Sequence, residues 1–163
     1  MSVPFAEIEG DFLRITAATV FCAATTVDHQ GRPRGRMLHP IFVARAGRPV
    51  GWALTGRTPL KTRHLAANPH VSCAFWTPSH DTVFADCIAT WVDDEAEKED
   101  VWELFLTTPV PLGYGPAGLA GYGSDRWRDP IFAALRLEPW RVQVMRGEEY
   151  PSGALSGTVW KAD

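Results

Sequence analysis

The first two-thirds of the chain alternates between short runs rich in β-branched and aromatic residues and tight clusters of turn residues. Such runs predict strands joined by hairpins, and residues 29–33, His-Gln-Gly-Arg-Pro, are typical of a hairpin loop. Many strands with few helices favour a mainly β fold, an antiparallel barrel that is closed or partly closed. We predict strands over residues 19–28, 34–44, 50–55, 71–76, 83–92 and 135–145.

Two prolines fall inside predicted strands. Pro40 requires an edge position or a bulge in the run 34–44, because proline cannot donate to a sheet ladder. Pro139 divides the last run into one or two strands.

Helices are predicted at three places. Apolar spacing predicts a helix from Phe5 to about Ala18, and a second over residues 59–67. Asp94 is expected to cap a third, with Glu97 as the reciprocal arm of a capping box. Residues 108–125 are rich in Gly, Pro and Tyr without a clear period, which is typical of a functional loop. We therefore expect one domain over 1–150, followed by a loosely held tail over 151–163.

Composition excludes several classes of function. A length of 163 residues suits one domain, and the formal charge of −3 argues against nucleic-acid binding. No apolar run approaches the length of a membrane span, and the first residues lack the pattern of a secretory signal, so a cytoplasmic location is expected. Cys22, Cys73 and Cys87 are predicted to be buried free thiols. Neither they nor the histidines show metal-ligand spacing, so no metal is predicted.

The stretch from Thr55 to Lys61 carries the clearest chemical signal. Thr58 is a good N-cap and Pro59 suits the first helical position, so the helix start offers free backbone donors to an anion. Gly56 allows close approach of a ligand, and Lys61 adds positive charge. The pattern indicates a pocket for a phosphate monoester. From the residues alone, an ordinary capped helix with surface cations remains an equal alternative.

These motifs together resemble a known family. The strand 35–38 (Gly-Arg-Met-Leu), the loop 55–61, the Asn-Pro pair at 68–69 and the strand 71–76 are similar to the pyridoxamine 5′-phosphate oxidase-like flavoproteins, which include bacterial general stress proteins. The resemblance covers roughly residues 20–144. It implies a split β-barrel, bound FMN, and a homodimer with cofactor sites at its interface.

The resemblance also implies roles for particular residues. Arg36, Met37 and Leu38 would line the flavin, and Lys61 would bind its phosphate. Pro59 and Leu60 stand where the family often has Ser and Arg, so those two contacts are missing. Thr58 or Arg57 would replace them. The expected cofactor-binding set is Arg36, Met37, Leu38, Thr55, Gly56, Arg57, Thr58, Lys61 and Trp91, the last completing a site across the dimer.

Three functions follow as alternatives. The first is an FMN-dependent oxidoreductase that transfers hydride to or from a small molecule. The second exchanges FMN for the deazaflavin F420, whose acidic tail needs cations such as Arg57, Lys61 and Arg63. The third is a flavin- or haem-binding protein without turnover. No general acid or base stands out except His39, for which a structural role is equally open. The substrate motif of true pyridoxamine phosphate oxidases is missing.

Overall fold

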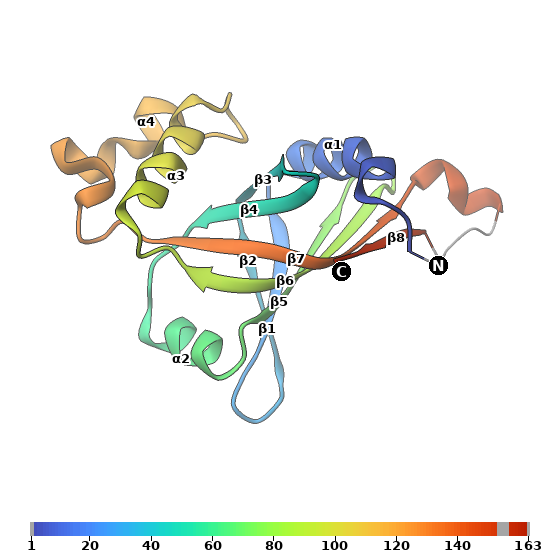
Figure 1. Ribbon diagram of the computed structural model, residues 1–163, viewed down its shortest axis with the longest axis horizontal. Coiled ribbons are helices and arrows are strands. Elements are labelled where there is room, and N and C mark those ends of the chain that lie inside the picture. The colour runs from blue at the N-terminus through green and yellow to red at the C-terminus, as the bar shows by residue number, and fades with distance from the viewer. Residues whose placement is uncertain (1, 153–156, 163) are drawn as a thin grey trace.

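The computed structural model describes residues 2–152 and 157–162, and in this part of the chain eight strands form one antiparallel sheet. The strand order is β2-β1-β5-β6-β7-β4-β3, with β8 added on β7 (Figure 1). The mainly β prediction is confirmed. The strands are β1 (Cys22–Val27), β2 (Pro33–Leu38), β3 (Pro40–Arg45), β4 (Arg48–Leu54), β5 (His70–Trp76), β6 (Thr82–Trp91), β7 (Ala134–Met145) and β8 (Thr158–Lys161).

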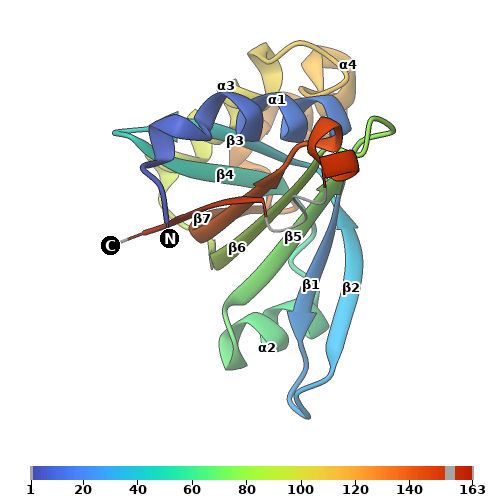
Figure 2. The same ribbon diagram turned by 90° about the vertical axis from the view of Figure 1, so that its right-hand side faces the viewer.

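Helices cover two separate parts of this sheet. Helices η1 and α1 form one group near the N-terminus, and α3, α4 and η2 form the other, directly before β7. Helix α2 is separate from both and lies beside the lower part of the β1–β2 hairpin in both views (Figures 1 and 2). The α-helices are α1 (Glu9–Thr19), α2 (Pro59–Ala67), α3 (Glu95–Thr107) and α4 (Gly115–Leu119). The 3-10 helices are η1 (Phe5–Glu7), η2 (Ala120–Arg128) and η3 (Gly147–Ser152).

The predicted single strand over 34–44 is wrong: it is two strands that separate at His39. Strand β2 pairs with β1, whereas β3 pairs with β4 at the other end of the strand order. The residue before a proline is held in an extended conformation and Pro40 has no N–H, so the chain changes partners here without breaking a ladder. This change opens the barrel between β2 and β3.

The predicted interruption at Pro139 takes the form of a bulge. Strand β7 runs unbroken, and its pairing with β6 shifts register between Asp86, which faces Arg141, and Cys87, which faces Pro139. The missing proline N–H therefore falls where the ladder is already irregular.

Two further predictions need correction. Residues 108–125 are not an irregular loop, because they include α4 and much of η2. The segment expected to be a loose tail contains β8, whose Trp160 is buried against β7 partner Val142. Residues 153–156 and 163 of that predicted tail lie outside the described residues. The division at residue 150 remains a prediction.

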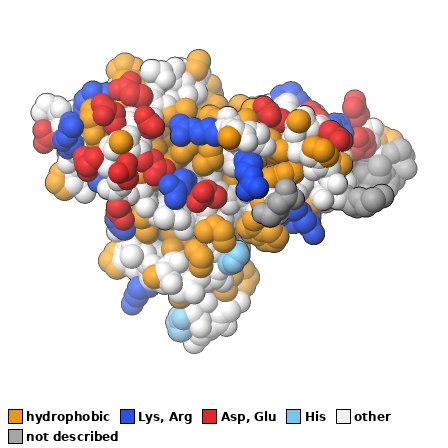
Figure 3. All heavy atoms as spheres, in the orientation of Figure 1, with side chains coloured by type: hydrophobic (Ala, Val, Ile, Leu, Met, Phe, Trp, Pro, Cys, Tyr) orange, Lys and Arg blue, Asp and Glu red, His pale blue; other side chains and the backbone are white. Residues whose placement is uncertain are grey.

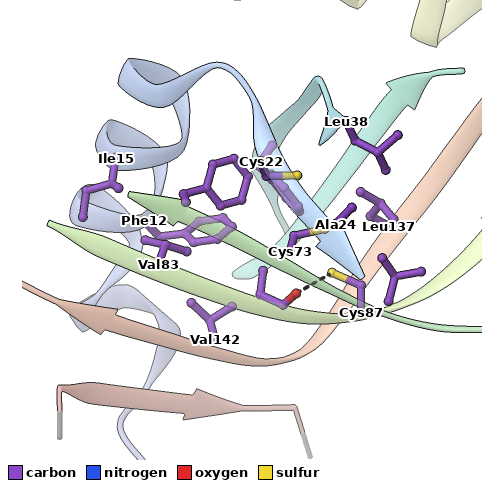
Figure 4. Packing of buried hydrophobic residues seen from close by; sticks show 14 of the residues in the cluster. Phe12, Ile15, Cys22, Ala24, Leu38, Cys73, Val83, Cys87, Leu137 and Val142 are labelled. Atoms are coloured by element: carbon purple, nitrogen blue, oxygen red, sulfur yellow. Dashed lines mark hydrogen bonds between the residues drawn. The ribbon is translucent and has the colours of Figure 1, made fainter. Parts of the chain in front are cut away.

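The core has two parts. The larger one packs α1 against the sheet around Phe12, Val83 and Leu137 (Figure 4). It includes all three cysteines, which are free and buried as predicted, with the Cys87 thiol donating to the Ala85 carbonyl at 3.4 Å. The smaller core joins α3, α4 and η2 to the sheet through Ile41, Trp52, Trp102, Phe105, Leu119, Trp127 and Phe132. Among the described residues, no helix combines the length and apolar character needed to cross a membrane.

Candidate functional site

The loop between β4 and α2 has the predicted anion-binding form. Thr58 adopts an extended conformation and its hydroxyl accepts from the Lys61 backbone N–H at 3.4 Å, while Pro59 opens the helix. The Thr55 N–H donates to the Ala133 carbonyl at 3.0 Å, which fixes the start of the loop to the segment before β7. The first N–H groups of any helix have no partner within the helix, so its start favours an anion.

The Lys61 side chain folds back over this loop. Its Nζ donates to Thr55 Oγ1 at 2.5 Å and to the Gly56 carbonyl at 2.9 Å. Burial lowers the pKa of Lys61, and the nearby charge of Arg36 lowers it further. Both of these acceptors are neutral oxygens, and no ion pair of Lys61 occurs within the described residues. A phosphate would supply the missing negative charge.

Arg36 lies next to Lys61 from the other side, on β2. Its Nη2 donates to Thr26 Oγ1 at 2.9 Å, and burial followed by the charge of Arg34 lowers its pKa. Arg36 and Lys61 line one small hollow together with Leu38. The structure thus brings together three of the predicted residues that the sequence separates by up to 25 positions.

Met37 does not share this face. Successive side chains of a strand alternate, so Met37 points away from Arg36 and is 63% exposed, whereas Leu38 is buried in the larger core. Strand β2 lies at an end of the strand order, so half of its backbone N–H and C=O groups point away from β1. The strand can therefore offer backbone donors to a flat ring, with Met37 as an apolar contact beside them.

The other four predicted residues line a different cavity. Gly56, Arg57, Thr58 and Trp91 face a space of about 480 Å³ whose opposite wall is the segment Trp127–Ala134. Here Arg57 is already engaged: its guanidinium donates to Asp93 Oδ1 at 2.6 Å and lies 5.1 Å from the centre of the Trp91 ring. The pKa of Asp93 is lowered by that hydrogen bond. Arg57 is therefore a poor substitute for the missing phosphate contacts.

Two residues near Trp91, Asp93 and Lys98, line the cavity and were not predicted from the sequence. The Trp91 indole Nε1 is buried and has no hydrogen-bond partner among the described residues. Lys98 at the start of α3 and Asp93 also line the cavity. Nothing in the sequence signals their approach, because Asp93 lies 36 positions from Arg57. The Gly- and Pro-rich stretch that precedes Trp127 was the one available signal for the opposite wall.

His39 holds a loop in place and lines neither cavity. Its Nε2 lies 2.6 Å from the Leu112 carbonyl oxygen, and its ring packs 4.9 Å from that of Tyr114. Burial lowers the pKa of His39, and the Leu112 contact raises it in part. Because a bare nitrogen cannot pair with a carbonyl, Nε2 carries the proton. These contacts give His39 a structural role between β2 and β3.

No potential metal centre of three or more His, Cys, Asp or Glu side chains occurs in residues 2–152 and 157–162. The groups that gather at the β4–α2 loop are instead cations and hydroxyls. This donor set suits an anionic organic cofactor better than a metal ion.

Comparison with known proteins supports the fold. No protein-family model matches the sequence, and no curated protein matches it. A protein of Clostridium acetobutylicum related to general stress protein 26, of the pyridoxine phosphate oxidase family, superposes with a TM-score of 0.69 at 15% identity, over 96% of both chains.

Two other solved structures differ in what they are described as binding. A pyridoxamine 5′-phosphate oxidase-related, FMN-binding protein of Nostoc punctiforme gives a TM-score of 0.60 at 15% identity, over 88% of this chain and 84% of its own. A haem-binding protein of Mycobacterium smegmatis gives 0.53 at 18% identity, over 85% of this chain and 57% of its own. As the sequence motifs predicted, the chain has the split β-barrel fold of the pyridoxamine 5′-phosphate oxidase-like proteins.

Proposed function

We propose that the chain binds FMN at the β4–α2 loop and acts as a flavin-dependent oxidoreductase on a small molecule. One observation carries the proposal: Lys61 and Arg36 are two half-buried cations that lie together and, among residues 2–152 and 157–162, donate only to neutral oxygens. Placing two like charges side by side away from water is unfavourable unless an anion joins them. A phosphate at the start of α2 meets that need.

The residues present fit the flavin. Lys61, the Thr55 hydroxyl and the N–H groups of the α2 start would hold the phosphate, and Arg36 would stand near the ring. The bound flavin would supply the hydride chemistry, and the chain would position it. A fixed guanidinium stabilises negative charge that develops close to it, so Arg36 would favour the reduced ring.

A homodimer belongs to the same proposal. The hollow between Arg36 and Lys61 has a volume of only about 10 Å³, whereas pockets that enclose organic cofactors measure roughly 300–1,000 Å³. A ring bound here would therefore lie against open surface beside Met37. A second copy of the chain would supply the missing wall, in keeping with the exposure of Met37.

Titration of the purified protein with FMN tests the proposal. Flavin fluorescence gives the affinity, and anaerobic mixing with NADH or NADPH shows whether bound flavin is reduced. Arg36→Gln should weaken binding and lower the flavin reduction potential, while Arg48→Gln, an exposed arginine at the start of β4, is the matched control. Failure of the wild-type chain to bind FMN would overturn the proposal.

F420 is the second candidate, favoured by one observation. Arg63 lies two residues from Lys61 on α2 and faces a pocket lined by two further arginines, which would suit an acidic tail. Retention of F420 in place of FMN would select this candidate. Because a haem-binding protein shares the fold, haemin is included as a third ligand. Flavin that binds without reduction by any donor would indicate a binding protein without turnover.

A further inference from the structure

A second pocket, of about 340 Å³, opens between the β1–β2 hairpin and α2. Its wall contains Arg32 and Arg34 from the hairpin, and Arg63 and His64 from α2. We call it the arginine pocket. It shares no lining residue with the hollow at Lys61 or with the 480 Å³ cavity.

Asp28 is the only carboxylate among the residues that line this pocket, and both of its oxygens already accept hydrogen bonds within the hairpin. One oxygen, Oδ1, accepts from the backbone N–H groups of Gln30 and Arg32 at 2.9 and 3.0 Å. The other accepts from Arg32 Nε at 2.9 Å. Asp28 therefore shapes the hairpin loop and neutralises Arg32 alone.

Arg34 and Arg63 are the two arginines of this wall that Asp28 does not neutralise. Both are exposed, and neither has a carboxylate within ion-pair distance in the part of the chain that the structure describes. On the face drawn in Figure 3, acidic side chains gather over α3 and α4, while the projection formed by α2 and the hairpin shows no acidic side chain. In a chain of net charge −3, this local excess of cations is the opposite of the average surface.

His64 adds a buried polar group to the wall. The residue is 6% exposed, and its Nδ1 is buried without a hydrogen-bond partner among the described residues. An imidazole donates from whichever nitrogen carries its proton, so a proton on Nδ1 would make this atom a donor that an anion in the pocket satisfies. In that tautomer His64 offers a donor to an acceptor in the pocket, whose wall also holds the two unpaired arginines.

Strand β2 connects this pocket to the cofactor residues. Arg34, Arg36 and Leu38 are every second residue of the strand, so their side chains share one face, from the hairpin toward the core. The charge of Arg34 helps to lower the pKa of Arg36, and the charge of Arg36 helps to lower the pKa of Lys61. Strand β2 therefore carries one cation of the arginine pocket, Arg34, and one cation of the hollow at Lys61, Arg36.

We infer that the arginine pocket binds a phosphate or carboxylate group, held by Arg34 and Arg63 with His64 as a further donor. Guanidinium groups are well suited to such anions because they donate two parallel hydrogen bonds. The anion is either a second acidic group of the bound cofactor or part of a separate anionic ligand. The pocket itself does not depend on which cofactor occupies the neighbouring site.

Calorimetric titration with inorganic pyrophosphate tests this inference on flavin-free protein. All variants carry Lys61→Ala, so that the β4–α2 loop does not compete for the probe. We expect Arg34→Gln/Arg63→Gln to weaken pyrophosphate binding at least about tenfold at low salt, since both arginines make charge-assisted contacts. Arg48→Gln, which removes an exposed arginine far along the strand order, should change it less than about twofold. Circular dichroism confirms that each variant is folded.

Two outcomes would overturn the inference: no pyrophosphate binding to Lys61→Ala protein, or equal binding after the double substitution. The source of the anion is then separated in the otherwise native chain. If Arg34→Gln/Arg63→Gln weakens F420 but not FMN, the pocket receives the acidic tail of the cofactor. If it weakens pyrophosphate alone, the pocket receives a separate ligand. Failure of FMN binding by the wild type bears only on the proposed function.

Discussion

Cations at the two ends of the molecule have opposite surroundings. Near α3, Arg136 donates to Glu97 at 2.9 Å, Arg126 pairs with Glu103, and Arg57 pairs with Asp93. Around the β1–β2 hairpin and α2, the acceptors of Arg36 and Lys61 in the described part of the chain are all neutral oxygens. The first region satisfies its charges within the chain, and the second leaves them for something else.

The difference separates structural charges from candidate ligand contacts. A cation with its own carboxylate gains little from binding an anion, because the two compete for the same donors. A half-buried cation without one has lost hydration and gains nothing in return until an anion arrives. The sequence contains arginines in both regions, and only the partners tell them apart.

The largest effect is expected from a core substitution in the helical region around α3, which should lower the free energy of unfolding without lowering FMN affinity. Phe105 on α3 is fully buried and packs against the rings of His39 and Tyr114. Phe105→Ala should lower the free energy of unfolding by about 3–5 kcal/mol, because it leaves a cavity in the smaller core. Urea unfolding measures the loss. FMN affinity of the protein that remains folded should change less than about twofold. An equal loss of affinity would show that the helical region forms part of the cofactor site.

The reverse result is expected at the loop. Lys61→Ala should weaken FMN binding by about 1.5–3 kcal/mol, or roughly ten- to 150-fold, because it removes a hydrogen-bond donor to a charged group. Thermal stability should hardly fall, since the amine contacts only Thr55 and Gly56. Fluorescence titration and a melting curve measure both. Unchanged affinity would remove Lys61 from the phosphate site.

Local features of this site could be predicted because they are encoded by neighbouring residues. The Thr58 cap, Pro59 at the helix start and the end of α2 at Ala67 all follow from short-range geometry. The same reasoning placed the start of α3 at Asp94, whose side chain accepts from the Glu97 N–H at 2.8 Å. It was wrong about the Glu97 side chain, which does not complete a capping box and instead accepts from Trp52 Nε1 and Arg136.

Long-range partners escaped prediction for the same reason. The change of sheet partner at His39 depends on the pairing of β3 with β4, and a run of strand-forming residues does not indicate which strand it will pair with. The predicted set likewise divides between two cavities: Arg57 and Thr58 line one and Lys61 lines the other, although the three lie within five consecutive positions of the sequence. Gly-rich sequence at 108–125 disguised short helices that are held by packing on Trp102 and Phe105 rather than by their own propensity.

Glu97 offers a smaller test of the paired region. Glu97→Ala should cost about 1–3 kcal/mol of stability, because it leaves the Trp52 N–H without its acceptor and leaves Arg136 with Glu138 alone. Glu97→Gln should recover part of this, since its amide oxygen still accepts from Trp52. Arg63→Gln is the counterpart in the unpaired region and should cost less than about 0.5 kcal/mol. Urea unfolding measures both losses of stability. If Glu97→Ala and Arg63→Gln lower the free energy of unfolding equally, the two regions do not differ in how their charges contribute to stability.

The smallest effect is expected from Asp28, the single acid of the unpaired region. The pKa of Asp28 is lowered to about 2, mainly by the hydrogen bond from the backbone N–H of Arg32. The Arg32 guanidinium and the Gln30 N–H lower it further. Because the folded-state pKa lies below the unfolded value of about 3.9, this stabilisation is present above pH 4 and is lost as the pH falls toward 2. Melting temperatures measured from pH 5 to pH 2 should therefore fall less steeply for Asp28→Asn than for the wild type. Parallel curves would mean that the Asp28 charge does not hold the hairpin, and Arg32 would then count with Arg34 and Arg63 as a cation free to bind an anion.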